Sequence, residues 1–123
     1  MKKLLLILIC LFVSSGFSSN KEWMKYFSNE NGDYYYDKKG MKKRGDFVYV
    51  WELSDYLNPL RGEYFSSIDY TKIDCLNKRY TPIKNLYFTE PMGKGLMKDL
   101  SHLETGESYS ILNKYESTMN PHS

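Results

Sequence analysis

The chain has 123 residues, enough for one domain, and no repeat is visible at the periods of solenoid proteins. Its formal charge is +2, but the 17 basic residues less Lys2 and Lys3 of an expected leader leave 15, against 15 acidic residues. A neutral mature chain gives no general electrostatic reason to expect nucleic acid or an anionic membrane as partner. Twelve tyrosines help to bring the aromatic share to 16%. Tyrosine favours strands and half-buried surfaces, so the composition predicts a small β protein.

Residues 1–18 are predicted to be a secretory signal peptide and not part of the fold. A basic start is followed by a continuous apolar run over 4–13 and by small residues over 14–18. The apolar run is too short to span a membrane, which makes an uncleaved anchor the less favoured alternative. Cleavage is expected before Ser19, with cleavage after Gly16 as the rival. The exported remainder, residues 19–123, is predicted to be a single β domain.

Cys10 lies inside this leader and raises the question of a lipid anchor. The tripeptide Leu8-Ile9-Cys10 weakly resembles the motif that precedes a lipoprotein cysteine. Ile9 is bulky where a small residue is expected, and the apolar run continues beyond the cysteine. A lipid anchor is therefore the minority interpretation, and no transmembrane span is expected after cleavage.

The first part of the mature chain is predicted to form two strands and a brief third. Residues 21–28 and 33–37 have strand composition, and Asn31-Gly32 between them is a strong hairpin signal. A turn over 38–40 leads into a short extended segment over 41–44.

Residues 46–54 are predicted to be the central strand. Val48 and Val50 alternate with aromatic residues, a period of two that is typical of a strand with apolar residues on both faces. We expect the tryptophan of this strand to be largely buried at the centre of the sheet. The predicted core consists of four aromatic residues: Trp23, Phe47, Tyr49 and Trp51.

The second half of the chain alternates between strands and turns. Residues 55–62 are predicted to be a polar loop, and 64–75 and 79–89 to be strands. Pro82 removes a backbone donor, so its strand is expected at an edge or with a bulge. A turn is predicted over 91–95, and the sequence beyond it supports no assignment. The fold class is therefore mainly β, a single twisted antiparallel sheet of about five to six strands.

No combination of residues predicts an enzyme. His102 and His122 have no companion ligands nearby in sequence, and Cys75 has no specified base to activate it. Asp69 and Asp74 are an odd number of positions apart in the sequence, which places them on opposite faces of a strand. No phosphate-binding loop or metal-ligand spacing is present, so no cofactor is expected.

The candidate binding residues lie in a basic cluster. Lys42, Lys43 and Arg44 follow the turn at 38–40, and Tyr35 lies close by in the preceding strand. The favoured interpretation is a solvated turn whose lysines protect a sheet edge. The alternative is an electrostatic contact for an acidic partner, such as a sulfated polysaccharide or a matrix protein.

The order of several short motifs resembles the surface-adhesin protein E family of small exported bacterial proteins. These motifs are Trp23, Tyr35-Tyr36-Asp37, Gly45 with Val48-Tyr49-Val50-Trp51, Ser67 with Ile73-Asp74-Cys75, Arg79, Tyr87, Gly93-Lys94-Gly95, Lys114-Tyr115-Glu116 and Pro121-His122-Ser123. The resemblance covers almost the whole mature chain. It implies a twisted antiparallel sheet with a helix packed on it. It also implies a surface protein that binds host matrix and serum proteins.

The chain departs from this family at its end. The family continues past the Pro-x-Ser segment into a helix that ends near a second cysteine, whereas this sequence stops at Ser123. The C-terminal helix is therefore expected to be missing or rudimentary. Cys75 is then expected to be unpaired, either as a free thiol or in a Cys75–Cys75 homodimer.

Two functions from different classes follow from these observations. The first is a non-catalytic binding module that contacts host extracellular-matrix or serum proteins from the outer-membrane surface. The second is a periplasmic accessory or inhibitor protein that binds a component of the bacterial envelope. Both require export, and the sequence does not name the ligand.

Overall fold

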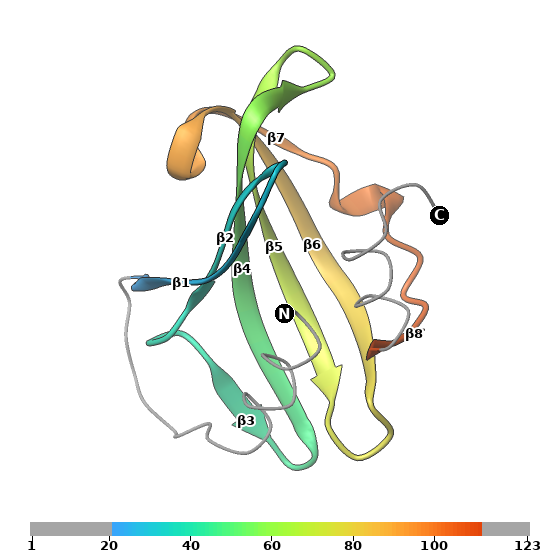
Figure 1. The fold of residues 1–123 in the computed structure, drawn as a ribbon. Coiled ribbons are helices and arrows are strands. Elements are labelled where there is room, and N and C mark those ends of the chain that lie inside the picture. The colour runs from blue at the N-terminus through green and yellow to red at the C-terminus, as the bar shows by residue number, and fades with distance from the viewer. Residues whose placement is uncertain (1–20, 112–123) are drawn as a thin grey trace.

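The computed structural model describes residues 21–111, which form one antiparallel sheet (Figure 1). Six strands lie side by side in the order β1-β2-β4-β5-β6-β7, while β3 pairs with β4 and β8 pairs with β6. The predicted fold class is confirmed, and the short strands β3 and β8 extend the predicted sheet beyond its six main strands. The strands are β1 (Trp23–Asn29), β2 (Gly32–Asp37), β3 (Lys42–Arg44), β4 (Phe47–Leu60), β5 (Tyr64–Asp74), β6 (Arg79–Glu90), β7 (Lys94–Asp99) and β8 (Tyr109–Ser110).

The predicted hairpin joins β1 to β2, one residue earlier than the Asn-Gly pair suggested. Asn29 pairs with Gly32, so Glu30 and Asn31 form the tip. The Asn29 side chain accepts hydrogen bonds from the backbone N–H groups of Asn31 at 2.8 Å and Gly32 at 3.2 Å. Gly32 is needed for close packing, because a Cβ built there would collide with the carbonyl oxygen of Asp55.

β4 is the long central strand, and it continues through the segment that was predicted to be a polar loop. Its residues 55–60 remain extended, and Leu60 pairs with Tyr64 of β5 after an irregularity in the register. The turn to β5 is confined to 61–63, where Arg61 and Gly62 have positive φ values of 53° and 69°. The loop prediction was wrong because hydrogen bonding to a neighbouring strand outweighs polar composition here.

β6 carries the bulge that its proline predicted. Tyr70 pairs with Lys84 and Thr71 with Pro82, which leaves Ile83 as the extra residue. On the other side of β6, β7 pairs with 86–90 and β8 with 79–80, so no strand faces Pro82 there. Pro82 therefore lies in a gap between the two partner strands, where its lack of a backbone N–H costs no hydrogen bond between strands.

Two 3₁₀ turns complete the described chain. The predicted turn after β6 is η1 (Pro91–Gly93), and η2 (Ser101–Leu103) follows β7. β7, η2 and β8 were not predicted, since their residues are mostly exposed and carry no clear hydrophobic alternation.

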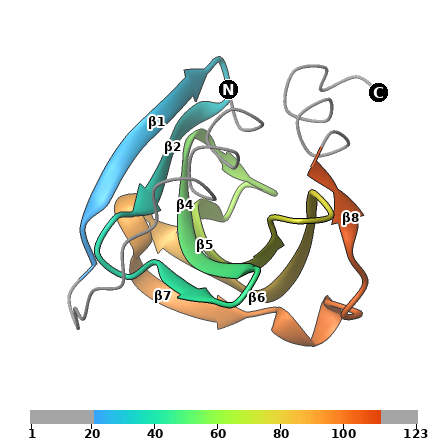
Figure 2. The ribbon, with the colours of Figure 1, turned by 90° about the horizontal axis from the view of Figure 1, so that it is seen from below.

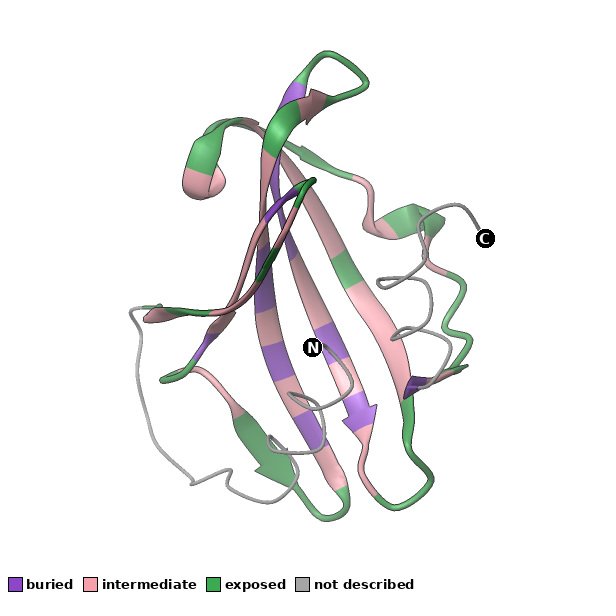
Figure 3. Ribbon diagram, viewed as in Figure 1, coloured by how far each residue is buried: buried purple, intermediate pink, exposed green. Residues whose placement is uncertain are grey.

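The sheet is curved, and its core lies on the concave side. Seen from below, the strands follow an arc instead of a plane (Figure 2). Ile111, which follows β8 at one end of this arc, packs with Val48, Val50 and Ile73 from the middle of the sheet. Such a contact requires that the valines face the inside of the arc. Buried positions accordingly alternate with half-buried ones along β4 (Figure 3).

The aromatic residues that were expected to form the core lie elsewhere. Phe47, Tyr49 and Trp51 alternate with the valines, so they point to the convex side, where they are half-buried. Trp23 in β1 is also only half-buried. The prediction of the core was wrong in its choice of face. The valines are buried because Ile111 and several partly buried side chains, among them Tyr26 and Tyr80, pack against them on the concave side.

Cys75 packs against the core and is disulfide-bonded in the structure, in contrast to the unpaired cysteine that was expected. The expected absence of a C-terminal helix concerns residues beyond 111, which lie outside the described range, as does the leader.

Candidate binding face

The convex side of the sheet carries a group of aromatic rings that we call the aromatic face. It consists of Phe47, Tyr49 and Trp51 of β4 and Tyr70 of β5. The pairing of Trp51 with Tyr70 places these two rings directly opposite each other on one side of the sheet. All four residues are half-buried.

Three of these rings form a continuous strip. The ring centres of Trp51 and Tyr70 are 4.5 Å apart, and those of Tyr70 and Tyr49 are 6.0 Å apart. These separations are typical of favourable aromatic pairs, which contribute about 0.5–1.5 kcal/mol beyond the area that they bury. Burial raises the pKa of the Tyr70 phenol, Arg44 offsets part of this effect, and Tyr49 adds to it.

Basic side chains stand over or beside the rings. The ammonium nitrogen of Lys72 lies 4.1 Å from the centre of the Phe47 ring, and that of Lys21 lies 4.8 Å from the centre of Trp51. Lys42 and Lys72 both pair with Tyr49, one from each side, so a ring lies between two cations in a single row across three strands.

Arg44 extends this arrangement at the end of β3. It pairs with Phe47, which places it on the same side of the sheet. We refer to the four cations that surround the aromatic face as the basic rim. They are Lys21, Lys42, Arg44 and Lys72.

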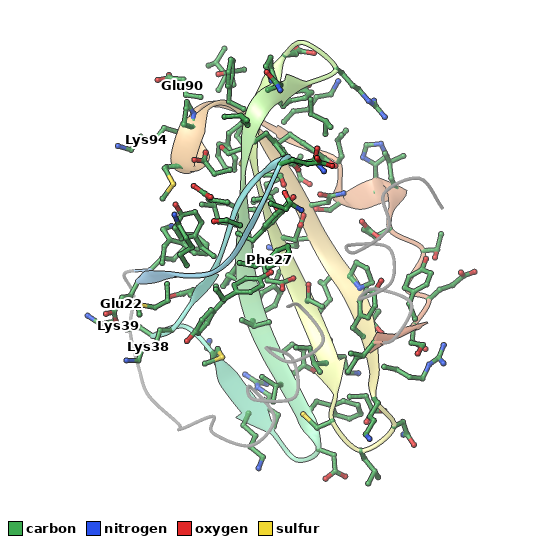
Figure 4. All side chains as sticks on the ribbon, in the orientation of Figure 1. Glu22, Phe27, Lys38, Lys39, Glu90 and Lys94 are labelled. Carbon is green, nitrogen blue, oxygen red and sulfur yellow. The ribbon has the colours of Figure 1, made fainter. Side chains whose placement is uncertain are left out.

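No cation of the basic rim forms an ion pair within the described residues. The described residues form two ion pairs, Lys25 with Asp33 at 3.4 Å and Lys39 with Glu22 at 3.9 Å, and neither includes a rim residue. Glu22 and Lys39 lie side by side near the end of β2 (Figure 4).

Asp74 pairs with Phe47, so this carboxylate lies on the same side of the sheet and next to the basic rim. Its side chain accepts hydrogen bonds from the Asn77 side chain at 2.9 Å and the Asn77 backbone at 3.1 Å. These bonds are the main reason why the pKa of Asp74 is lowered. Asp74 therefore mainly serves the turn between β5 and β6, and Lys72 of the basic rim makes a smaller electrostatic contribution to its lowered pKa.

The turn η1 marks the upper limit of the aromatic face. Gly93 lies over the convex side so closely that a Cβ built on it would be 2.7 Å from Cδ1 of Ile68 and 3.4 Å from Cδ1 of Leu53. Ser66 holds the turn, since its hydroxyl donates to the Glu90 carbonyl at 2.7 Å and accepts from the Gly93 N–H at 2.8 Å. Leu53 and Ile68 are consequently buried, whereas the rings below them are not.

The predicted binding residues divide between the two sides. Lys42 and Arg44 belong to the basic rim, but Lys43 pairs with Val48 and therefore points to the opposite side. Tyr35 shares the convex side but pairs with Leu53, about 20 Å along β4 from Phe47 at the usual rise per residue. Its ring has its own cation, Lys25, at 5.9 Å.

Sequence reasoning missed Tyr70, Lys72 and Lys21. The alternation of Ile68, Tyr70 and Lys72 in β5 was a usable signal, because it places the three side chains on one side of a strand. Their position beside the rings of β4 depends on the pairing register, which the sequence alone does not give.

The concave side also buries hydroxyl and carboxyl groups. The Tyr56 hydroxyl lies 2.8 Å from the Ser67 hydroxyl, and burial raises the pKa of Tyr56 to about 12 despite this hydrogen bond. Burial is also the main cause of the raised pKa of Tyr26, to which Glu52 adds. These groups stabilise the interior of the arc and do not reach the aromatic face.

Among residues 21–111, no three histidine, cysteine, aspartate or glutamate side chains lie close enough together to hold a metal ion. Within the same range, no helix is long and apolar enough to cross a membrane.

The fold resembles solved structures of Haemophilus influenzae protein E. Crystal form II of Haemophilus influenzae protein E is 16% identical to the chain with a TM-score of 0.55; the match covers 84% of this chain and 94% of that one. Protein E from non-typeable Haemophilus influenzae is 17% identical with a TM-score of 0.54, and the match covers 80% and 72% of the two chains.

No protein with a curated description matches the chain in sequence. The sequence profile of the family described as Surface-adhesin protein E does match, over residues 23–116. This range covers most of the sequence and all strands of the sheet. The chain therefore belongs to the surface-adhesin protein E family.

Proposed function

We propose that this protein is an exported, non-catalytic binding module that holds host extracellular-matrix or serum proteins at the bacterial surface through its aromatic face. The observation that carries the proposal is the strip of half-buried rings from Trp51 to Tyr49, surrounded by cations without carboxylate partners in the described chain. Membership of the surface-adhesin protein E family supports the surface location and the binding role.

The composition of the aromatic face suits protein recognition. Tyrosine, tryptophan and arginine are enriched at binding interfaces, where rings supply contact area at low entropic cost. A fold that needed these rings for its own core would bury them fully, as it buries Val48 and Val50. The rings of β4 remain half-buried instead, so they are available to a partner.

The test compares intact cells that express the full-length protein with cells that lack it, on surfaces coated with purified matrix or serum proteins. Expression should increase attachment, and the double variant Trp51→Ala/Tyr70→Ala should remove most of the increase. Lys43→Ala, an exposed change on the opposite side of the sheet, is the matched control and should attach like the wild type.

Location is tested on the same cells by adding protease without breaking the envelope. Digestion of the protein would support the surface adhesin. Protection from protease, together with unchanged attachment, would contradict the proposal and support the periplasmic accessory protein instead.

A further inference from the structure

We infer that the aromatic face and its basic rim form a binding site for a sulfated polysaccharide chain of the heparin type. This inference deepens the proposed function by naming the chemistry recognised, and it rests on that function only for the exposure of the site outside the cell. The site uses the four rings of the aromatic face and the four cations of the basic rim, as defined above.

The aromatic strip provides the first half of the recognition. Tyr49 and Tyr70 stack with an interplanar angle of 27°, and Trp51 continues the contact on the other side of Tyr70. Sugar rings present apolar C–H faces that pack against such rings through dispersion contacts. Because the strip joins two strands, it offers consecutive positions to a chain of linked sugars.

The basic rim provides the second half. Lys42 and Lys72 flank Tyr49 in one row, at spacings of about 4.8 Å between neighbouring strands. Arg44 follows at the end of β3, and guanidinium groups bind tetrahedral oxyanions with two parallel hydrogen bonds. Sulfate groups on either edge of a sugar chain would therefore meet cations while the sugar ring lies on Tyr49.

The charge balance favours a polyanion. No rim cation takes part in the two ion pairs of the described residues, and Asp74, the acid next to Phe47, is engaged by Asn77. Cations left without partners on one side of a protein attract an anionic polymer and release its counterions on binding. Basic patches of this kind are a known feature of heparin sites.

The shape favours a polysaccharide over an acidic peptide. The site lies on the convex side of the sheet, and affinity in protein interfaces is concentrated in pockets that enclose a few anchor residues. A convex strip provides no enclosure, whereas a polymer that alternates rings and anions can contact alternating rings and cations along its length. An acidic peptide is therefore the competing occupant, and the test includes it.

The experiment uses purified full-length protein and three probes: heparin, chemically desulfated heparin and polyglutamate. We expect binding to heparin that weakens steeply with salt, and at least tenfold weaker binding to the other two probes. Replacing Lys42 and Lys72 together by Gln should lower the slope of log affinity against log salt by about two, or one for each lost contact. Lys38→Gln/Lys39→Gln removes the same charge from exposed positions outside the site and should leave the slope unchanged.

A ring variant separates a stacked site from a simple basic patch. Tyr70→Ala should weaken heparin binding about tenfold and leave the salt slope unchanged, since it removes no cation. Melting curves of each variant show that it is folded.

Equal affinity for polyglutamate and heparin, or unchanged heparin binding by the Lys42/Lys72 variant, would overturn the inference. If heparin binding failed while cells still attached to matrix proteins, only the polysaccharide inference would fall and the proposed function would stand. If attachment were lost while heparin binding remained, the proposed function would fall and the polysaccharide site would stand.

Discussion

The ammonium of Lys72 stands 4.1 Å from the centre of the Phe47 ring, although the two residues are not direct partners in the sheet. Lys72 pairs with Tyr49, and Phe47 pairs with Asp74, so the contact runs diagonally from β5 to β4. A cation over a ring at a half-exposed site contributes about 0.5–1 kcal/mol. This geometry directs Lys72 along the surface and toward the rings, where its charge remains available to solvent.

The first prediction concerns which face of the sheet holds the fold together. Ile73→Ala should lower the free energy of unfolding by about 2–5 kcal/mol, because Ile73 is fully buried among Val48, Val50 and Ile111. Trp51→Ala should cost only about 1–2 kcal/mol, mostly from its contact with Tyr70. Urea titration of both variants measures the difference.

Lys43→Ala is the control for this comparison, since an exposed change should stay within about 0.5 kcal/mol of the wild type. A larger loss for Trp51→Ala than for Ile73→Ala would mean that the aromatic side is the true core.

The second prediction concerns the close approach of two strands at Gly32. In Gly32→Ala the new Cβ would collide with the Asp55 carbonyl oxygen, and relief requires that β2 and β4 move apart. Overpacking of this kind costs about 1–3 kcal/mol. Gly62→Ala is the comparison, because Gly62 has open space around it and carries only the cost of its positive φ. Thermal melting should place Gly32→Ala below Gly62→Ala.

The third prediction is a loss of stability at high pH that Tyr56 controls. Below pH 10 the tyrosine is protonated in both states, whereas between pH 10 and about 12 the unfolded chain loses this proton and the folded chain keeps it. The unfolded state then binds fewer protons, so the contribution of Tyr56 falls with rising pH by about 1.4 kcal/mol per unit.

Tyr56→Phe should therefore make the stability curve less steep in this pH range, as measured by urea unfolding at each pH. Tyr109→Phe removes the hydroxyl of an exposed tyrosine and is the control. Parallel curves for the wild type and Tyr56→Phe would show that burial of this hydroxyl does not govern alkaline unfolding.

The fold was largely predictable because its signals are local. The Asn-Gly pair predicts the first hairpin, alternation predicts β4 and β5, and Pro82 predicts the bulge in β6. The face of β4 that holds the core was not predictable in this way, because both faces are apolar. The curvature of the whole sheet decides it, and Ile111, far along the chain, closes the concave side.

The candidate site was predictable only in part for the same reason. Lys42 and Arg44 were found from their sequence neighbours, but Lys43 could not be separated from them without the pairing of β3 with β4. Tyr70 and Lys72 join the site through the register of β5 with β4, and that register joins residues about twenty positions apart. The site is therefore a property of the sheet and not of any segment.

The fourth prediction concerns export. We expect the exported protein to begin at Ser19 and to carry no lipid on Cys10, because the apolar run continues past the cysteine. The intact mass of the exported form measures both features. A mass that corresponds to a diacylated Cys10 would contradict the expectation and place the protein among the lipoproteins.

The last prediction concerns Ser66, whose hydroxyl joins η1 to the convex side of the sheet. Ser66 is fully buried, donates to the Glu90 carbonyl and accepts from the Gly93 N–H. Ser66→Ala leaves both backbone groups without this partner, and each buried group left unsatisfied costs about 1–3 kcal/mol. The turn should therefore loosen before the sheet unfolds, which exposes Leu53 and Ile68 beside the aromatic face.

Hydrogen exchange measures this local opening. The Gly93 amide should exchange much faster in Ser66→Ala, while amides in the middle of β4 and β5 should keep most of their protection. Ser28→Ala removes a hydroxyl that donates to Asp33 at an exposed site and should leave the Gly93 amide unchanged. If Gly93 exchanged at the same rate in both variants, the contact of Gly93 with Ile68, and not the serine, would be what holds the turn.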